Sequence, residues 1–293
     1  MSATRRSSAP RGAALVLVLW LIALLTALVG AFALSARIEQ LQQRVQDDSG
    51  RAQEIGRAGI AYALSRLRAD PQRTPWQPDG RRYRWQFDGA QVDIRIEDES
   101  GKVNINLADS ALLEGLLRAM DIPQDEAARV AGAIIDWRDP DDLSPPGGGA
   151  ELPDYVAAGL PYGPRNARFE TLGELQRVLG ISPALYRRLL PMITVHGRQS
   201  RPDSRFAKGP VLTALGLDAA LVLAQREQQW AGADDPGQVA AVATGSGTYS
   251  IECRVTDERG RIAVSRAVVR NTPNTAMGRA YTMLRWEQEM AAR

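Results

Sequence analysis

The chain has 293 residues, and its 36 Lys and Arg nearly balance its 34 Asp and Glu, for a formal net charge of +2 at pH 7. Such a balance gives no basic face of the kind that nucleic-acid-binding proteins use. The single histidine, His196, and the single cysteine, Cys253, exclude a Cys/His zinc site, a CxxC redox pair and an intramolecular disulfide.

An uncharged apolar run, AALVLVLWLIALLTALVGAFAL, occupies residues 13–34. A helix of about 22 residues is about 33 Å long, which is close to the hydrocarbon thickness of a bilayer. Arg5, Arg6 and Arg11 precede the run, and the positive-inside tendency places that side in the cytoplasm. We therefore predict a single-pass inner-membrane protein whose C-terminal part lies in the periplasm.

The ends of this run offer two processing sites. Ala31-Phe32-Ala33 fits the small-x-small pattern of signal peptidase, but the run exceeds the usual signal core of about 7–15 residues. Gly12 ends a basic leader at residues 1–12. Arg11-Gly12-Ala13 resembles the cleavage site of type IV pilin-like proteins, where a prepilin peptidase cuts after the glycine. The resemblance implies that Ala13 becomes the methylated first residue and that the apolar helix is retained.

The helix is expected to continue beyond the membrane, because no proline occurs from residue 35 to residue 68. Apolar residues recur there at mostly helical spacing, including Ile38, Leu41, Val45, Ile55 and Leu67. Glycines at 50, 56 and 59 weaken the prediction locally. A helix from 13 to 68 would be roughly 84 Å long. It is either a stalk or a helix that packs with neighbouring subunits in a filament.

Alternation with period two predicts strands after a turn region at 71–80 and again near the C-terminus. The predicted strands are 82–87, 91–97, 102–106, 249–256, 261–270 and 281–286, with a hairpin loop at Asp257-Glu258-Arg259-Gly260. The predicted fold class is α+β, with a small antiparallel sheet on the long helix. Residues 35–106 and 232–293 form this pilin-like part, 232–247 reads as loop, and an all-α insertion occupies 107–231.

Four helices are predicted in the insertion, at 109–120 with Asp109 as N-cap, 125–137, 171–179 and 183–190. Gly180-Ile181-Ser182 joins the last two, which look like a helix-hairpin-helix (SAM-like) unit. Such a hairpin can hold a DNA phosphate, and Arg187 and Arg188 could assist. A tight connection between helices is the simpler interpretation, and the near-neutral charge favours it.

An acidic loop lies between the helix pairs. Asp136-Trp137-Arg138-Asp139-Pro140-Asp141-Asp142 is followed by a Pro/Gly tract and by Glu151-Leu152-Pro153-Asp154. Calcium takes six to eight oxygen ligands in flexible geometry, so these carboxylates suit it, although the spacing is not that of an EF-hand. A solvated acidic loop is an equally good interpretation. A bound cation would order a loop that has few apolar groups to bury.

Together these segments resemble GspK, the minor pseudopilin family of type II secretion systems. The resemblance rests on the leader, on DESGKVNINLA at 98–108, and on IIDWRDPDD…GAELPDY…NARFETLGELQRVLGI, and it covers most of residues 11–195. It implies a pilin-like sheet on a long helix, an inserted helical domain and bound calcium. By position, the implied calcium ligands are Asp139, Asp141, Asp142, Glu151 and Asp154, with Asp136 as a further candidate.

The resemblance also implies a role at the tip of the periplasmic pseudopilus, where the protein starts or caps filament assembly for protein export. The implied partners are GspI- and GspJ-type minor pseudopilins, the prepilin peptidase and the inner membrane. A secreted substrate or the outer-membrane secretin would be further partners, and no nucleic acid is expected. The alternative is a membrane-tethered helix-hairpin-helix DNA-binding protein of a competence-like system.

Two positions depart from the usual patterns. Leu17 is the fifth residue after the cleavage site, where most pilin-like subunits carry a glutamate that pairs with an adjacent subunit. Its absence fits a subunit with no neighbour ahead of it, because a buried unpaired carboxylate is costly. In 201–215 the family's Asn-rich motif is missing, and only the apolar part at 211–215 echoes it.

His196 and Cys253 are interpreted as structural residues. Cys253 alternates with Ile251 and Val255 in a predicted strand, where a small core residue is expected. No serine lies in a nucleophile motif such as GxSxG. We therefore expect no enzyme activity.

Overall fold

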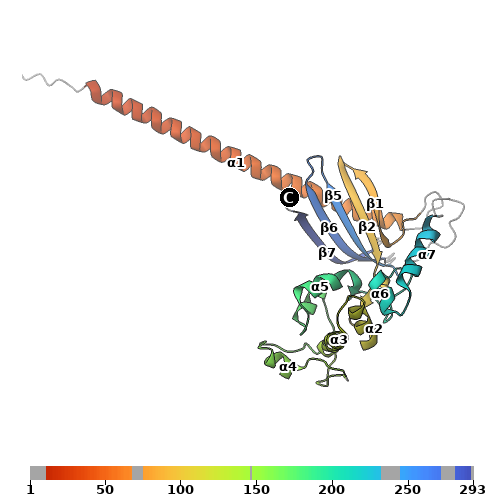
Figure 1. Ribbon diagram of the computed structural model, residues 1–293. Coiled ribbons are helices and arrows are strands. Elements are labelled where there is room, and N and C mark those ends of the chain that lie inside the picture. The colour runs from red at the N-terminus through yellow and green to blue at the C-terminus, as the bar shows by residue number, and fades with distance from the viewer. Residues whose placement is uncertain (1–10, 68–74, 146, 232–244, 272–280, 292–293) are drawn as a thin grey trace, which may run out of the picture. The chain divides into compact units, whose positions relative to one another are not determined.

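The computed structural model describes residues 11–67, 75–145, 147–231, 245–271 and 281–291, and it divides into two compact units, Met1–Glu54 and Ile55–Arg293. Helix α1 runs from Arg11 to Arg66 (Figure 1), close to the predicted bounds. In the first unit, Leu15–Ser35 has a mean hydropathy of 2.8 and buries no side chain within the protein. Among the described residues, this helix is long and apolar enough to cross a membrane.

A five-stranded antiparallel sheet belongs to the second unit (Figure 1). Its strands are β1 (Asp79–Phe87), β2 (Ala90–Asp98), β5 (Thr248–Thr256), β6 (Ile262–Arg270) and β7 (Thr282–Ala291). They lie in the order β1-β2-β5-β6-β7, so β2 pairs directly with β5 across the inserted segment. The structure thus confirms an antiparallel sheet split by an insertion. The β5–β6 hairpin turns at Asp257–Gly260, as predicted, and Gly260 supplies a positive φ of 74°.

The core of the sheet forms against the last turns of α1. Alternate residues of β2, including Ile94 and Ile96, are fully buried there with Ile60 of α1. Burial of one such side chain contributes about 1.5–3 kcal/mol. Gly59 allows this approach, because a Cβ at that position would lie 3.0 Å from the Sγ atom of Cys253. Cys253 is buried in the core, which is where the strand pattern placed it.

The segment between β2 and β5 has its own apolar core, which includes Leu116, Ile134, Leu175 and Leu212. Its elements are η1 (Glu99–Gly101), β3 (Val103–Asn104), α2 (Ser110–Arg118), α3 (Gln124–Arg138), α4 (Leu152–Ala157), η2 (Leu172–Arg177), α5 (Pro183–Leu189), η3 (Leu190–Met192), β4 (Ile193–Thr194), α6 (Gly209–Ala214) and α7 (Ala219–Ala231). Asp109 caps α2, as predicted, by accepting a hydrogen bond from the Leu112 N–H at 2.8 Å.

Some predicted elements differ in the structure. The strand predicted at 102–106 is the two-residue β3, which pairs in parallel with β4 because Val103 and Ile105 are buried in the helical core. The helix predicted at 171–179 is the 3-10 helix η2, in which the Glu174 carboxylate accepts hydrogen bonds from two preceding N–H groups. The helix-hairpin-helix assignment therefore stays a prediction.

The sequence patterns missed the short elements α4, α6 and β4 and the longer α7. Proline stands at the start of both α4 and α6, and each spans only six residues, too short for a helical period to be recognised. Helix α6 lies in the segment 201–215 that departs from the family pattern. Most of the loop predicted at 232–247 lies outside the described residues.

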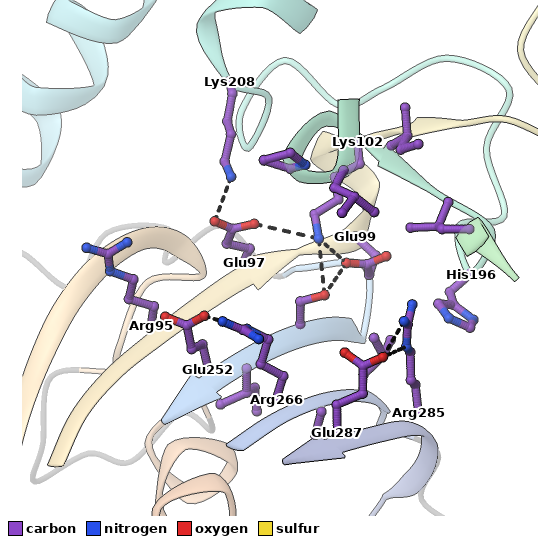
Figure 2. Close-up of a pocket in the computed structure, with 18 of the residues that line it drawn as sticks. Arg95, Glu97, Glu99, Lys102, His196, Lys208, Glu252, Arg266, Arg285 and Glu287 are labelled. Carbon is purple, nitrogen blue, oxygen red and sulfur yellow. Dashed lines mark hydrogen bonds and ion pairs between the residues drawn. The ribbon is translucent and has the colours of Figure 1, made fainter. Parts of the chain in front are cut away.

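A buried polar network links the helical segment to the sheet (Figure 2). The Nζ atom of Lys102 lies 2.5 Å from the Glu99 carboxylate, which also accepts hydrogen bonds from the hydroxyls of Ser250 on β5 and Thr194 on β4. Burial raises the pKa of Glu99, but Lys102 and these hydrogen bonds outweigh burial, so the pKa lies below its usual value. The network therefore holds an ionised glutamate.

Candidate metal centre

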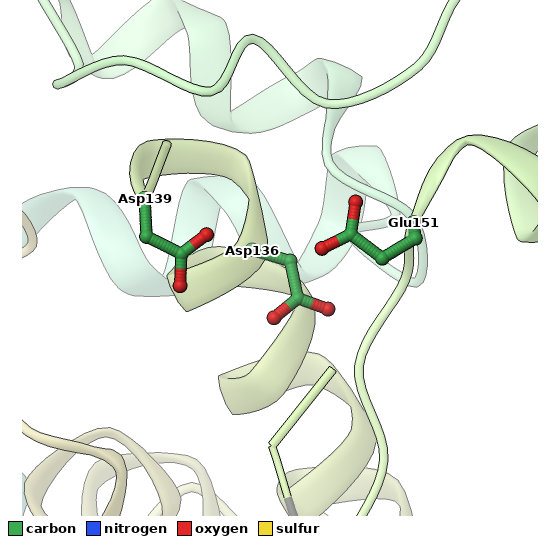
Figure 3. A group of neighbouring side chains, drawn as sticks. All are labelled: Asp136, Asp139 and Glu151. Atoms are coloured by element: carbon green, nitrogen blue, oxygen red, sulfur yellow. The ribbon is translucent and has the colours of Figure 1, made fainter. Parts of the chain in front are cut away.

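Three carboxylates meet where α3 ends and α4 begins. Asp136 lies in the last turn of α3, Asp139 is the C-cap of that helix, and Glu151 is the N-cap of α4. Each offers an oxygen within 4.8 Å of those of the other two. Figure 3 shows the carboxylates of Asp139 and Glu151 extending toward Asp136 from opposite sides. The spacing i, i+3 places the two aspartates on one side of the helix end.

The glycine tract carries the chain closely past α3 to reach this position. A Cβ on Gly132 of α3 would lie 1.9 Å from the Gly148 carbonyl oxygen, so neither segment could keep its place with a larger residue there. The Asp136 carboxylate then accepts hydrogen bonds from the Ala150 N–H at 2.7 Å and the Ser144 hydroxyl at 3.0 Å. These contacts place Glu151 beside Asp136.

Several oxygens of this cluster are buried without a hydrogen-bond partner. They are one oxygen each of Asp136 and Asp139 and both carboxylate oxygens of Glu151. The side-chain oxygen of Asn166, which follows α4, is also buried and unpartnered. A buried acceptor without a donor costs about 1–3 kcal/mol, and more when it is charged. A cation would satisfy several of these oxygens at once.

The electrostatics of the three carboxylates also favour a bound cation. Burial, and next the neighbouring carboxylates, raise the pKa of Asp136, of Asp139 and of Glu151, the last to about 7. The donor set consists of oxygens, with no nitrogen or sulfur, and such sets suit calcium better than zinc or copper. The residues present thus fit a calcium ion.

Of the five ligands implied by the resemblance, the structure brings together Asp139 and Glu151, and it adds Asp136, the further candidate. Asp141, Asp142 and Asp154 are exposed. Asp141 accepts from the Leu143 N–H at 2.9 Å, Asp142 from the Asn166 amide at 3.4 Å, and Asp154 from the Glu151 N–H at 2.9 Å. Asn166 was not predicted from the sequence, because no local spacing connects it with the acidic loop. Calcium binding itself stays a prediction.

The predicted processing site lies at the start of α1, which begins at Arg11 and includes Gly12 and Ala13 in its first turn. Arg5 and Arg6 of the leader lie outside the described residues. Cleavage after Gly12 and methylation of Ala13 also stay predictions.

Comparison with known proteins identifies relatives. Residues 95–198 match the family model described as type II secretion system (T2SS), protein K. The type II secretion system protein K of Pectobacterium carotovorum subsp. carotovorum is 30% identical over 211 residues, which cover 64% of this chain and 63% of that protein. The protein K of Pseudomonas aeruginosa is 31% identical over 137 residues, covering 44% of this chain and 41% of that protein. The matches thus span less than two thirds of either relative.

A solved structure shows the same fold. It is a chain of the crystal structure of the GspK-GspI-GspJ complex from the type 2 secretion system of enterotoxigenic Escherichia coli. The TM-score is 0.59 at 15% sequence identity, over 85% of this chain and 100% of that one. The shared architecture is a mixed α+β fold with an N-terminal helix and an antiparallel sheet. On these matches, the chain is similar to type II secretion system protein K, most clearly over residues 95–198, which match the family model.

Proposed function

We propose that this protein is a minor pseudopilin at the tip of a type II secretion pseudopilus, where it initiates or caps assembly for protein export from the periplasm. The observation that carries the proposal is the helical core inserted between β2 and β5, most of which lies within the segment that matches protein K. The insertion adds bulk to a helix-and-sheet unit. Subunits stacked within a filament leave little room for such bulk, whereas the end of a filament is open on one side.

The apolar segment supports membrane anchoring. Leu15–Ser35 is long enough to span the bilayer once, and the basic residues ahead of it favour a cytoplasmic N-terminus and a periplasmic C-terminal part. A prepilin peptidase would cut after Gly12 and leave Ala13 as the methylated first residue. Leu17 then places no carboxylate in the membrane that would need the amino terminus of a subunit ahead of it.

The proposed partners are the GspI- and GspJ-type minor pseudopilins. The similarity to a chain from a GspK-GspI-GspJ complex supports this choice. The work of the protein would be mechanical, and we propose no catalytic reaction. The DNA-binding alternative lacks a supporting observation, since one of its two proposed arginines, Arg188, donates a hydrogen bond to the Met120 carbonyl within the helical segment.

Co-expression tests the function. The full chain with a C-terminal tag is expressed with prepilin peptidase and with the GspI and GspJ types of the same bacterium, and is purified in detergent. We expect the two minor pseudopilins to co-purify, and the mass of the tagged chain to correspond to a start at a methylated Ala13. The matched variant Gly12→Leu should retain its leader. A mature chain that begins after Ala33, or one recovered without either pseudopilin, would contradict the proposal.

We propose further that Asp136, Asp139 and Glu151 hold a calcium ion. The unpartnered buried oxygens of these three residues support this assignment. When bound, the ion would neutralise the cluster and fix the loop between α3 and α4 against the helical core. Asp141 and Asp142 lie on this loop and Asp154 lies in α4, and all three are more exposed than Asp136, Asp139 and Glu151.

A further inference from the structure

A cleft of about 760 Å³ lies between the helical segment and the face of the sheet that points away from α1 (Figure 2). One wall comes from Leu172 of η2, Tyr186 of α5, and Leu190 and Pro191 of η3. The floor comes from the outward-facing side chains of β2, β5, β6 and β7. The three clustered carboxylates of the metal centre take no part in its lining, so this is a separate site.

The floor carries a row of alternating charges across four strands. Arg95 of β2 lies opposite Glu252 of β5, which lies opposite Arg266 of β6, which lies opposite Glu287 of β7. Opposite charges at such positions normally pair. Here Glu252 forms its ion pair with Arg266, whose Nε atom lies 2.7 Å from a carboxylate oxygen of Glu252. Figure 2 shows the guanidinium of Arg95 turned away from Glu252.

Four basic residues of the lining are paired with carboxylates of the cleft. The pairs are Lys102 with Glu99 at 2.5 Å, Lys208 with Glu97 at 2.7 Å, Arg266 with Glu252, and Arg285 with Glu287. Within such a pair the two charges largely cancel at the position of a ligand. Selectivity for charge therefore depends on the basic groups that remain unpaired.

Two arginines of the cleft lining have no carboxylate partner among the described residues. No carboxylate of the described chain lies within ion-pair distance of Arg95, which is exposed at the cleft. Arg187, on α5, uses its Nε atom to donate to the Pro183 carbonyl at 3.2 Å and has no carboxylate partner among the described residues. Both guanidiniums are thus available to an anion. The planar fork of arginine suits a carboxylate, to which it can donate two parallel hydrogen bonds.

We propose that this cleft binds an extended acidic segment of another protein, with its carboxylates on Arg95 and Arg187 and its apolar side chains against Tyr186 and Leu190. A volume near 760 Å³ lies within the range of about 300–1,000 Å³ typical of small-ligand sites, so it holds a short peptide segment rather than a folded domain. An extended segment turns alternate side chains to opposite sides. A segment that contains both acidic and apolar residues can therefore place carboxylates on Arg95 of the floor and on Arg187 of the wall, with apolar side chains against Tyr186 and Leu190.

Fluorescence anisotropy tests the proposal on the full-length chain in detergent micelles. The probe is a fluorescein-labelled peptide Leu-Glu-Val-Asp-Leu with blocked ends, and its analogue Leu-Gln-Val-Asn-Leu lacks the charges. We expect saturable binding of the acidic peptide and binding of the analogue weaker by about tenfold or more, since hydrogen bonds to charged groups are the stronger ones. Arg95→Gln and Arg187→Gln should each weaken the acidic peptide about tenfold.

Arg254→Gln is the matched control. Arg254 is an exposed arginine of β5 on the same face of the sheet, without a carboxylate partner among the described residues, and it does not line the cleft. Its variant should bind the acidic peptide like the original chain. Equal binding of the two peptides, an equal loss in Arg254→Gln, or no saturable binding up to about 1 mM would overturn the proposal. Tighter binding of a short DNA duplex would replace it with a nucleic-acid site. None of these readouts depends on pseudopilin partners or on calcium.

Discussion

Two buried glutamates of the second unit lie in opposite surroundings. Glu99, at the junction between sheet and helical segment, has an ammonium group at 2.5 Å and accepts hydrogen bonds from two hydroxyls, and its pKa lies below the usual value. Glu151, in the acidic loop, has neither oxygen satisfied and faces other carboxylates, and burial together with these neighbours raises its pKa to about 7. The charge of Glu99 is paired within the chain, whereas no Lys or Arg of the described residues forms an ion pair with Asp136, Asp139 or Glu151.

The stability of the junction around Glu99 and that of the acidic loop should depend on different factors. A buried charge with a hydrogen-bonded partner is costly to disturb, because removal of one partner leaves the other uncompensated. A buried cluster of like charges is costly to keep, because its members repel one another and are poorly solvated. The junction should therefore respond to mutation and the acidic loop to ions and pH.

The largest loss of stability from a single substitution is expected at Glu99, in the junction between sheet and helical segment. Glu99→Ala leaves Lys102 with only the more distant Glu97 carboxylate at 3.6 Å, and should lower the free energy of unfolding by about 3 kcal/mol. Glu151→Ala in calcium-free buffer removes a repelled, unpartnered carboxylate and should cost far less. Urea denaturation of the detergent-solubilised chain in EDTA measures both. Equal losses would mean that the two glutamates do not differ as described.

Calcium should stabilise the acidic loop and leave the junction around Glu99 unchanged. A free calcium concentration of about 100 times the dissociation constant should raise the free energy of unfolding by about 2.7 kcal/mol. Magnesium, which requires stricter octahedral geometry, should give a smaller increase. Glu99→Ala should keep the calcium increment, because its site is separate. Thermal melts with calcium, magnesium or EDTA measure the difference, and identical curves would remove the metal assignment.

The contribution of each carboxylate to calcium affinity should increase with its burial. Asp136, which is fully buried, should matter most, and Asp136→Asn should weaken calcium binding by about tenfold or more in titration calorimetry. Asp141 is exposed and its carboxylate accepts from the Leu143 N–H, so Asp141→Asn is the matched control and should change affinity little. An equal loss in both variants would show that the loop rearranges to bring Asp141 to the ion.

The two glutamates should also give the stability pH dependences of opposite sign. Because the pKa of Glu151 is raised, the free energy of unfolding without calcium should fall as the pH rises from 4.5 to about 7. The variant Glu151→Gln should remove this decrease. The lowered pKa of Glu99 means that its contribution is present above pH 4.5 and is lost as pH falls through the lower folded value. Unfolding measured from pH 3 to pH 8, in about unit steps, separates the two windows. A single common slope would contradict the comparison.

Local pattern was sufficient for much of the fold. The apolar run ahead of Ser35, the alternation of Ile94 and Ile96 on β2, and the turn before Gly260 each repeat with a period set by backbone geometry within a few residues. These features therefore predicted the long helix, the split sheet and the hairpin. The same logic failed at 171–179, where Leu172, Leu175 and Val178 are buried at a spacing of three, the period of the observed 3-10 helix rather than of the predicted α-helix.

By itself, the sequence determined the long apolar helical segment, the strands and the presence of an acidic loop, because periodicity and composition act over neighbouring residues. Only the tertiary structure decided which carboxylates meet, since the close passage of Gly148 over α3 places Glu151 beside Asp136. It also decided that Arg95 has no carboxylate partner among the described residues, because Arg266 pairs with Glu252, the glutamate opposite Arg95. Contacts between residues far apart in the chain depend on how whole elements pack, and local spacing does not encode them.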